Sequence, residues 1–218
     1  MHYSDVNIPQ VARLQPVKIW NLKRYFCDSL SKRSGAFLSV GFGQGDDLVV
    51  ARELGFKRVI GIDVDKGAVA KLGKEFETRV YNGKKFPVPS SSLDVVMMNN
   101  VLEHLQDPVP TIKEIARVLK KGGHAIITTP DPSQANSYFS NFWADQTHVR
   151  PYHRIAVENL VKQNGFEVKR GYVRVANVPV LQAVLTRLRL YPVLFFLTDV
   201  FNVFRLGIKE VCVVAVKK

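Results

Sequence analysis

Glycines and a carboxylate at two predicted strand ends are the first residues of this chain whose types and spacing could bind a ligand. The apolar stretch 36–40 leads into a helical pattern through a turn of five residues: Gly41, Phe42, Gly43, Gln44 and Gly45. Such glycines allow tight backbone angles and close approach of a ligand to the main chain, and a helix start offers free N–H groups. Eighteen residues past Gly45, the apolar stretch 58–62 ends at Asp63, where an acid binds ribose hydroxyls in doubly wound folds. Together these features predict a site for a cofactor that contains adenosine.

The start of the following helix indicates the charge of that cofactor. Asp46 and Asp47 stand there, and two carboxylates would repel a pyrophosphate but tolerate a cationic ligand with an amino group and a sulfonium. The turn also has GxGxG spacing, whereas a dinucleotide fingerprint is GxGxxG with the pyrophosphate on the helix start. The residues therefore favour S-adenosylmethionine over NAD.

The elements around these residues alternate between strands and helices. The predicted strands are 36–40, 58–62, 78–81, 93–98, 124–129, 166–173 and 208–216, and the predicted helices are 16–31, 46–54, 66–76, 107–119 and 155–164. The pair Gly122 and Gly123 is expected to stop the helix that begins at 107. Short strands that are apolar on both faces and alternate with helices predict a parallel sheet covered on both sides.

Several segments in this order resemble the class I S-adenosylmethionine-dependent methyltransferases, in the branch with a VLEH motif after the fourth strand. The matching segments are VGFGQG at 40–45, GIDVD at 61–65, NGKKFPVPSSSLDVV at 82–96, NNVLEHL at 99–105 and LKKGGHAIITTP at 119–130. The resemblance covers about residues 36–175. It implies an α/β, Rossmann-like, doubly wound and mostly parallel seven-stranded sheet whose last strand is antiparallel.

The same resemblance implies which residues bind the cofactor. They are Gly41, Phe42, Gly43 and Gly45 along the methionine part, Asp63 at the ribose, Val64 near the adenine, Asn82 and Gly83 at the adenine amine and ring nitrogen, and Asn99 beneath the methionine. The family usually has Asp-Ala where this chain has Asn-Gly at 82–83. An Asn carbonyl oxygen can accept the same hydrogen bond.

Methyl transfer from a sulfonium needs mainly alignment, because the cofactor is already activated. A general base helps only where the acceptor must lose a proton. The segment WADQTHVRPYH at 143–153 resembles an Asp-x-x-His-x-Arg-Pro pattern of the family, often preceded by Trp, and implies an acceptor pocket lined by Trp143, Asp145, His148 and Arg150. We predict His148 as the base, with Asp145 orienting it, and His104 of the VLEH motif as a second candidate. Alternatively, Asp145 and His148 only pin the loop, and His104 only caps its turn.

We expect one domain of 218 residues, with an N-terminal helical extension (1–34), a cofactor-binding core (35–130), a substrate loop (131–154) and an apolar helical insert (178–207) before the last strand. The two cysteines, Cys27 and Cys212, do not form a disulfide scaffold. No metal site is expected. A cytoplasmic location is the default for a chain of this cysteine content without an apolar N-terminal signal.

The charge distribution bears on the acceptor. The net charge of +12 lies in the flanks, with +4 in residues 1–34, zero in 35–145 and +8 in 146–218. Such an excess either favours anionic partners or only keeps the protein soluble. Nucleic acid is disfavoured, because residues 99–102 lack the Asn/Asp-Pro-Pro-aromatic motif of enzymes that methylate base amines, and basic residues do not alternate with aromatics along one stripe.

The preferred acceptor is therefore a small molecule or a lipid- or glycan-linked molecule, methylated at oxygen. The insert is too interrupted by charges to span a membrane, so it either packs on the fold or makes peripheral contact with an anionic membrane. Two alternatives stay open: an NAD(P)-dependent oxidoreductase, and a binding module that holds S-adenosylmethionine without turnover.

Overall fold

The computed structural model describes residues 22–25, 30, 34–132, 142–177, 193, 196–197, 200 and 208–218. In these residues, strands and helices alternate along the chain. The strands are β1 (Ala36–Val40), β2 (Arg58–Asp63), β3 (Glu77–Val80), β4 (Leu93–Asn99), β5 (Leu119–Pro130), β6 (Phe166–Asn177) and β7 (Ile208–Lys217). The helices are α2 (Asp46–Glu53), α3 (Lys66–Leu72), α4 (Val109–Val118), α6 (Arg154–Gln163) and the short 3-10 helix η2 (Leu102–His104).

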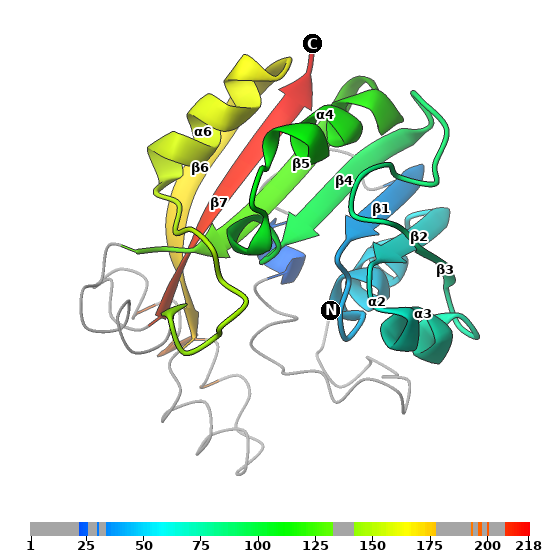
Figure 1. Ribbon diagram of the computed structural model, residues 1–218, viewed down its shortest axis with the longest axis horizontal. Coiled ribbons are helices and arrows are strands. Elements are labelled where there is room, and N and C mark those ends of the chain that lie inside the picture. The colour runs from blue at the N-terminus through cyan, green and yellow to red at the C-terminus, as the bar shows by residue number, and fades with distance from the viewer. Residues whose placement is uncertain are drawn as a thin grey trace.

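The strands form one sheet in the order β3-β2-β1-β4-β5-β7-β6 (Figure 1). The pairs among β1 to β5 are parallel, while β7 runs antiparallel to both of its neighbours, β5 and β6. This confirms the predicted doubly wound sheet and its antiparallel last strand. The chain leaves β1 toward β2 on one side and β4 toward β5 on the other, so the two adjacent strands β1 and β4 form the switch point where such sheets bind ligands.

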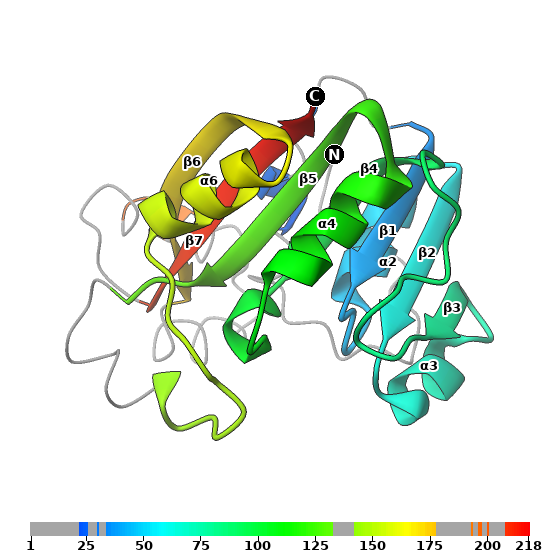
Figure 2. The ribbon, with the colours of Figure 1, turned by 45° about the horizontal axis from the view of Figure 1, so that its top comes forward.

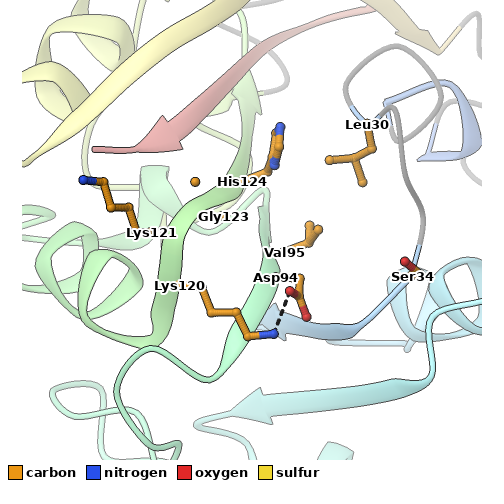
Figure 3. A pocket seen from close by; sticks show the side chains of 9 residues that line it. Leu30, Ser34, Asp94, Val95, Lys120, Lys121, Gly123 and His124 are labelled. Carbon is orange, nitrogen blue, oxygen red and sulfur yellow. Dashed lines mark hydrogen bonds and ion pairs between the residues drawn. The ribbon is translucent and has the colours of Figure 1, made fainter.

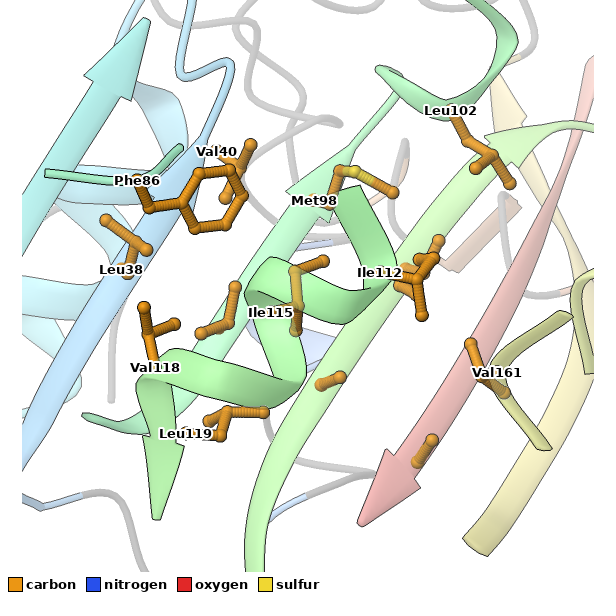
Figure 4. Close-up of a cluster of buried hydrophobic side chains, with 14 of the residues drawn as sticks. Leu38, Val40, Phe86, Met98, Leu102, Ile112, Ile115, Val118, Leu119 and Val161 are labelled. Carbon is orange, nitrogen blue, oxygen red and sulfur yellow. The ribbon is translucent and has the colours of Figure 1, made fainter. Parts of the chain in front are cut away.

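Alternate residues along each central strand enter two different cores. On β4, Val96 and Met98 pack with the cluster under α4 and α6, whereas Val95 and Met97 pack with the cluster around α2. Figure 2 shows α4 and α6 on the same face of the sheet, and Figure 4 shows the apolar face of α4 directed at the strands. Burying each such Val, Ile or Met side chain contributes about 1.5–3 kcal/mol. Both faces of the sheet are therefore packed against helices, and this packing holds in place the strand ends that carry the site.

Two predicted helix ends were wrong. The helix expected over 66–76 ends at Leu72, because Gly73 begins a turn that places Phe76 in the core before β3. The Gly122–Gly123 pair does not stop a helix: α4 already ends at Val118, and both glycines lie within β5. The pairing of β4 with β5 shifts register between the pair Leu93–Leu119 and the pair Val95–His124. The β5 residues between Leu119 and His124 are therefore not paired with β4, and Gly122 among them has a φ of +77°.

Of the predicted N-terminal helix, the structure describes residues 22–25 as helical. Tyr25 is fully buried and its hydroxyl donates to Glu210 Oε2 on β7 at 2.6 Å, while Asn100 Nδ2 donates to Glu210 Oε1 at 2.8 Å. This segment is thus tied to the last strand. Most of the insert predicted over 178–207 lies outside the described residues, and within the described part no helix is long and apolar enough to cross a bilayer.

Candidate active site

The glycine turn after β1 has the left-handed backbone that its sequence predicted. Gly41, Gly43 and Gly45 have φ values of +68°, +50° and +86°. A Cβ at Gly41 would lie 2.5 Å from Val101 Cγ2, and one at Gly45 would lie 2.5 Å from Leu72 Cδ1, so a side chain at either position would need both a strained backbone and a shift of its neighbour. Within the part of the chain that the structure describes, a Cβ at Gly43 would meet nothing within 4 Å. The middle glycine therefore borders open space at the switch point, where a ligand can approach the main chain.

Asp63, at the end of β2, faces this turn. Its Oδ2 accepts a hydrogen bond from the Gly43 N–H at 3.0 Å, and its Oδ1 accepts one from the Asp65 N–H at 3.0 Å. A carboxylate has about four acceptor positions, so both oxygens can still accept from a ribose. The neighbouring Val64 side chain is 59% exposed, which offers an apolar surface beside the acid.

The two carboxylates at the start of α2 are both buried, and Asp47 is part of a polar network. Asp47 Oδ2 accepts from Ser39 Oγ at 2.9 Å and Asp47 Oδ1 accepts from Asn99 Nδ2 at 3.2 Å. Asn99 Oδ1 in turn accepts from Thr128 Oγ1 at 2.5 Å. Carboxyl groups therefore lie under the turn, and that of Asp47 is held by the ends of β1 and β4. Asn99 is fixed in one orientation at the end of β4.

The Asn82–Gly83 turn differs from what the sequence suggested for Asn82. Its Oδ1 accepts hydrogen bonds from the N–H groups of Lys84 and Lys85, at 3.0 and 3.1 Å. This oxygen is therefore already used inside the turn. Gly83 has a φ of +75°, and a Cβ there would meet nothing within 4 Å. The backbone at Gly83 is consequently the part of this turn that a ligand can reach.

Glu103 lies at the centre of a second group of polar residues, after β4. Its side chain is 1% exposed, and its Oε2 accepts from Thr129 Oγ1 at 3.0 Å. Among the described residues, Oε1 has no hydrogen-bond partner. Burial raises the pKa of this carboxyl to about 7 against the opposing effect of its hydrogen bonds, and the nearby charges of Glu210 and Asp145 add to the rise.

The two predicted histidines meet beside Glu103. Their rings lie 4.6 Å apart between centroids. His148 Nδ1 is 2.6 Å from the Phe142 carbonyl oxygen, and His104 Nδ1 is 2.9 Å from Thr147 Oγ1, whose hydroxyl also lies 2.6 Å from Asp145 Oδ1. These contacts hold the loop against the turn after β4, and the choice between a base and a purely structural His148 stays a prediction.

Asp145 approaches the other nitrogen of the His148 ring. Its Oδ2 is 3.7 Å from His148 Nε2, and the His148 side chain is 11% exposed. The hydrogen bonds with Thr147 lower the pKa of Asp145, so Asp145 stays ionised beside the imidazole. The structure thus brings His148, Asp145 and His104 together, but the Phe142 carbonyl, rather than Asp145, orients the His148 ring.

The cofactor turn and the histidine group lie on the same edge of the sheet. The link is made by consecutive threonines at the end of β5: Thr128 bonds to Asn99, which reaches α2, and Thr129 bonds to Glu103. Backbone N–H groups of Val149 and Arg150 also donate to the Glu103 carbonyl oxygen, at 2.8 and 3.3 Å. The loop that carries His148 is therefore attached directly to the turn that carries Glu103.

Sequence reasoning missed several members of this site: Ser39, Glu103, Thr128, Thr129 and Thr147. A signal existed for the threonines of β5, because two hydroxyl residues that follow an apolar run mark the polar end of a strand. Glu103 stands next to His104 in the VLEH motif, but nothing in its local pattern indicates complete burial.

A cavity of about 310 Å³ lies at the opposite end of the sheet (Figure 3). It is lined near the starts of β4 and β5, and the Lys120 Nζ and Asp94 Oδ1 atoms at its wall form an ion pair at 2.7 Å. Ligands of open α/β sheets bind beyond the carboxyl ends of the strands. This cavity is therefore separate from the site described above.

The pattern of strand-end residues can now be compared with known proteins. A family model described as a methyltransferase domain matches residues 18–170. The chain belongs to this methyltransferase family. Over 134 residues, the methyltransferase is 34% identical to a Mycolicibacterium smegmatis protein named as a probable S-adenosylmethionine-dependent methyltransferase, with 59% of this chain and 50% of that protein covered.

Other relatives agree with this assignment. A Mycobacterium tuberculosis protein with the same description is 38% identical over 96 residues, which cover 42% of this chain and 33% of that protein. The methyltransferase chain thus spans half or less of the length of these curated relatives. Its fold matches the crystal structure of an S-adenosylmethionine-dependent methyltransferase from Archaeoglobus fulgidus with a TM-score of 0.68 at 20% identity, over 94% of this chain and 95% of that chain.

S-adenosylmethionine is the cofactor that this family and fold indicate, as the sequence predicted. The described residues fit it. No described residue lies within 4 Å of a Cβ built at Gly43 or Gly83, so two backbone turns are open to a ligand on the described side of the site. Buried carboxylates near the start of α2 suit a ligand with an amino group and a sulfonium. The match to a methyltransferase model decides against the nicotinamide alternative.

Proposed function

We propose that this methyltransferase domain moves a methyl group from S-adenosylmethionine to a hydroxyl oxygen of a small or lipid- or glycan-linked acceptor. When bound, the cofactor supplies an electrophilic methyl carbon. The glycine turn and Asp63 hold it at the switch point, and Val64, Gly83 and Asn99 are proposed contacts. Asn82 Oδ1 holds the turn that presents Gly83. The acceptor approaches from the loop that carries His148. The observation that supports an oxygen acceptor is the hydrogen bonding of that histidine.

A carbonyl oxygen can only accept a hydrogen bond, so the contact with Phe142 places the proton of neutral His148 on Nδ1. Nε2 then carries the lone pair and can take the proton that an acceptor hydroxyl loses. The resulting imidazolium would lie 3.7 Å from the Asp145 carboxylate, which stabilises its charge. In this proposal Asp145 stabilises the charged ring, and His104 holds the loop through Thr147.

An activity assay with methyl-labelled S-adenosylmethionine tests this proposal. The purified protein is incubated with extracted small-molecule and lipid fractions, and label in the product is located by mass spectrometry. We expect the label in a methyl ether. His148→Gln should retain affinity for S-adenosylhomocysteine and lose about 10²–10⁴-fold in turnover, whereas His153→Gln, outside the histidine group, should change neither.

Three outcomes would contradict the proposal. Label at nitrogen or sulfur would refute the oxygen acceptor. Full turnover by His148→Gln would refute the base. Cofactor binding with no labelled product from any fraction would favour the alternative of a non-catalytic binding module.

A lipid-linked acceptor is supported by charge and exposed apolar residues. The net charge of +8 lies in residues 146–218, and the described helical residues Val193 and Phe196 of the insert are 44% and 67% exposed. Cationic and apolar residues on one segment favour anionic membrane surfaces. We expect sedimentation with anionic but not neutral vesicles at low salt, reduced by Phe196→Ser. Equal recovery with both vesicle types would contradict peripheral contact, and the cytoplasmic location remains a prediction.

A further inference from the structure

The group formed by Glu103, His104 and His148 has the composition of a metal site. One ligand atom from each residue lies within 4.8 Å of the other two. Two imidazoles with one carboxylate are a set that binds zinc or another divalent transition metal and leaves coordination positions open. The residues come from two segments that are far apart in the sequence, so no local spacing of ligand residues indicates this group.

The hydrogen bonds around the histidines prepare them for such a role. Metal-binding histidines usually donate their second ring N–H to a backbone carbonyl or to a polar group that is itself held. His148 Nδ1 lies 2.6 Å from the Phe142 carbonyl oxygen, and His104 Nδ1 lies 2.9 Å from Thr147 Oγ1. The Thr147 hydroxyl is held in turn by Asp145. With both Nδ1 atoms engaged, the lone pair of each neutral ring is on Nε2.

Glu103 gives an independent indication of a ligand. Its side chain is 1% exposed, and only one of its oxygens has a partner, Thr129. The other oxygen, Oε1, is buried without a hydrogen-bond partner in the part of the chain that the structure describes. A buried unpaired carboxylate oxygen is costly unless it binds a cation or a donor. Asp145 adds a second carboxylate, 3.7 Å from His148 Nε2.

We propose that Glu103, His104 and His148 bind one divalent transition-metal ion, with zinc as the reference metal. Zinc–ligand distances of about 2 Å in a tetrahedral site place neighbouring ligand atoms about 3.3 Å apart. Because the ligand atoms here lie within 4.8 Å of one another, the three side chains need to draw together by at most about 1.5 Å. The site lies on the acceptor side of the sheet edge, and its open positions suit an acceptor oxygen.

The use of the metal in catalysis rests on the proposed function, whereas its binding does not. With a metal on Nε2, His148 no longer takes a proton from the acceptor. The metal would instead lower the pKa of a bound hydroxyl, whose proton would pass to the Asp145 carboxylate. The proposed base and the proposed metal site therefore differ in what His148 Nε2 binds during the reaction: the proton of the acceptor in the first case and a metal ion in the second.

The test is binding of Zn²⁺ alone to the chelator-treated full chain. Calorimetry and elemental analysis after dialysis should give one zinc per chain, and Co²⁺ should give visible absorption bands that zinc removes. Glu103→Gln and His148→Gln should each weaken zinc binding by about 100-fold or more, and Thr147→Val, which removes the group holding His104, by about 10- to 100-fold. His153→Gln is the matched control and should bind zinc like the wild type. Mg²⁺ should not compete, because it prefers oxygen ligands.

Several results would overturn the proposal. One is binding of clearly less than one zinc ion per chain. Another is an equal zinc affinity in the wild type and in folded Glu103→Gln and His148→Gln variants, which would mean that the binding is adventitious. If a variant fails to fold by circular dichroism, NMR of the wild-type histidine ring protons decides: zinc must shift the signals of His104 and His148 and leave that of His153 unchanged. Methyl transfer measured with chelator in the same samples separates the two proposals. Transfer that persists without zinc binding removes the metal alone, while zinc binding without oxygen methylation removes the proposed function alone.

Discussion

A single added methyl group can test where the cofactor lies. Gly43 has a φ of +50°, and a Cβ there would meet nothing within 4 Å. Gly165, the residue after the C-cap of α6, has a φ of +92° and equally open surroundings. Alanine at either position must adopt a left-handed backbone, which costs roughly 1–2 kcal/mol. For a chain of this size that corresponds to a fall in Tm of about 2–8 °C in both variants.

The two variants should differ in cofactor affinity. The methyl group of Gly43→Ala projects into the open space in front of the turn, where we place the methionine part of the cofactor. Forcing a methyl group into a packed contact costs about 1–3 kcal/mol, which is about a 5- to 150-fold increase in Kd. Gly165→Ala lies away from the site and should bind as the wild type does.

Calorimetry with S-adenosylhomocysteine and thermal melts of the three proteins give both quantities. Wild-type affinity in Gly43→Ala, together with the same loss of Tm as in Gly165→Ala, would refute the placement of the cofactor against this turn. A loss of affinity in both variants would mean that the effect comes from general loosening of the fold.

Three further changes test other contacts. Asp63→Asn should weaken S-adenosylhomocysteine binding by about 10- to 150-fold, because hydrogen bonds to charged groups contribute about 1.5–3 kcal/mol; calorimetry showing an unchanged Kd would contradict its role at the ribose. Tyr25→Phe removes a buried 2.6 Å hydrogen bond to Glu210 and should cost about 1.5–3 kcal/mol in urea unfolding, so an unaltered midpoint would show that this contact is not stabilising. Partial burial raises the pKa of Asp94, but hydrogen bonds from Lys120 and a backbone N–H of β1 outweigh it and lower the pKa overall. Its stabilising effect is therefore present above the unfolded pKa of about 3.9 and is lost as pH falls through the lower folded value. Asp94→Asn should be less stable than the wild type at pH 7 and should approach it below about pH 4; a constant difference in urea midpoints would oppose this assignment.

The strands were predictable because β-branched and apolar runs end at residues that cannot continue them. The run at 36–40 matches β1 at both ends, and β2 extends the predicted run by one residue to Asp63. The doubly wound, mostly parallel sheet and its antiparallel last strand followed from the family resemblance. The glycines at 41–45 were also predictable, because a tight turn between a strand and a helix requires their backbone angles.

Side-chain partners were less predictable, because they depend on distant residues. Nothing near Asp47 in the sequence indicates that Ser39 and Asn99 hold its carboxylate. Asn82 was expected to offer its oxygen to a ligand, but the turn brings two local N–H groups to it first. The meeting of Glu103 with His148 depends on how a long loop folds back across the end of the sheet, and no periodicity in the sequence reports this.

The paired threonines at the end of β5 have a consequence for changing the acceptor. Thr128 and Thr129 are rigid strand residues, fully buried, that join the cofactor side to Glu103. In the proposed function they would set the distance between the methyl donor and its acceptor, with the exposed segment 143–147 on the acceptor side. Exchanging that segment between relatives should then change which acceptors are methylated and leave the affinity for S-adenosylhomocysteine unchanged.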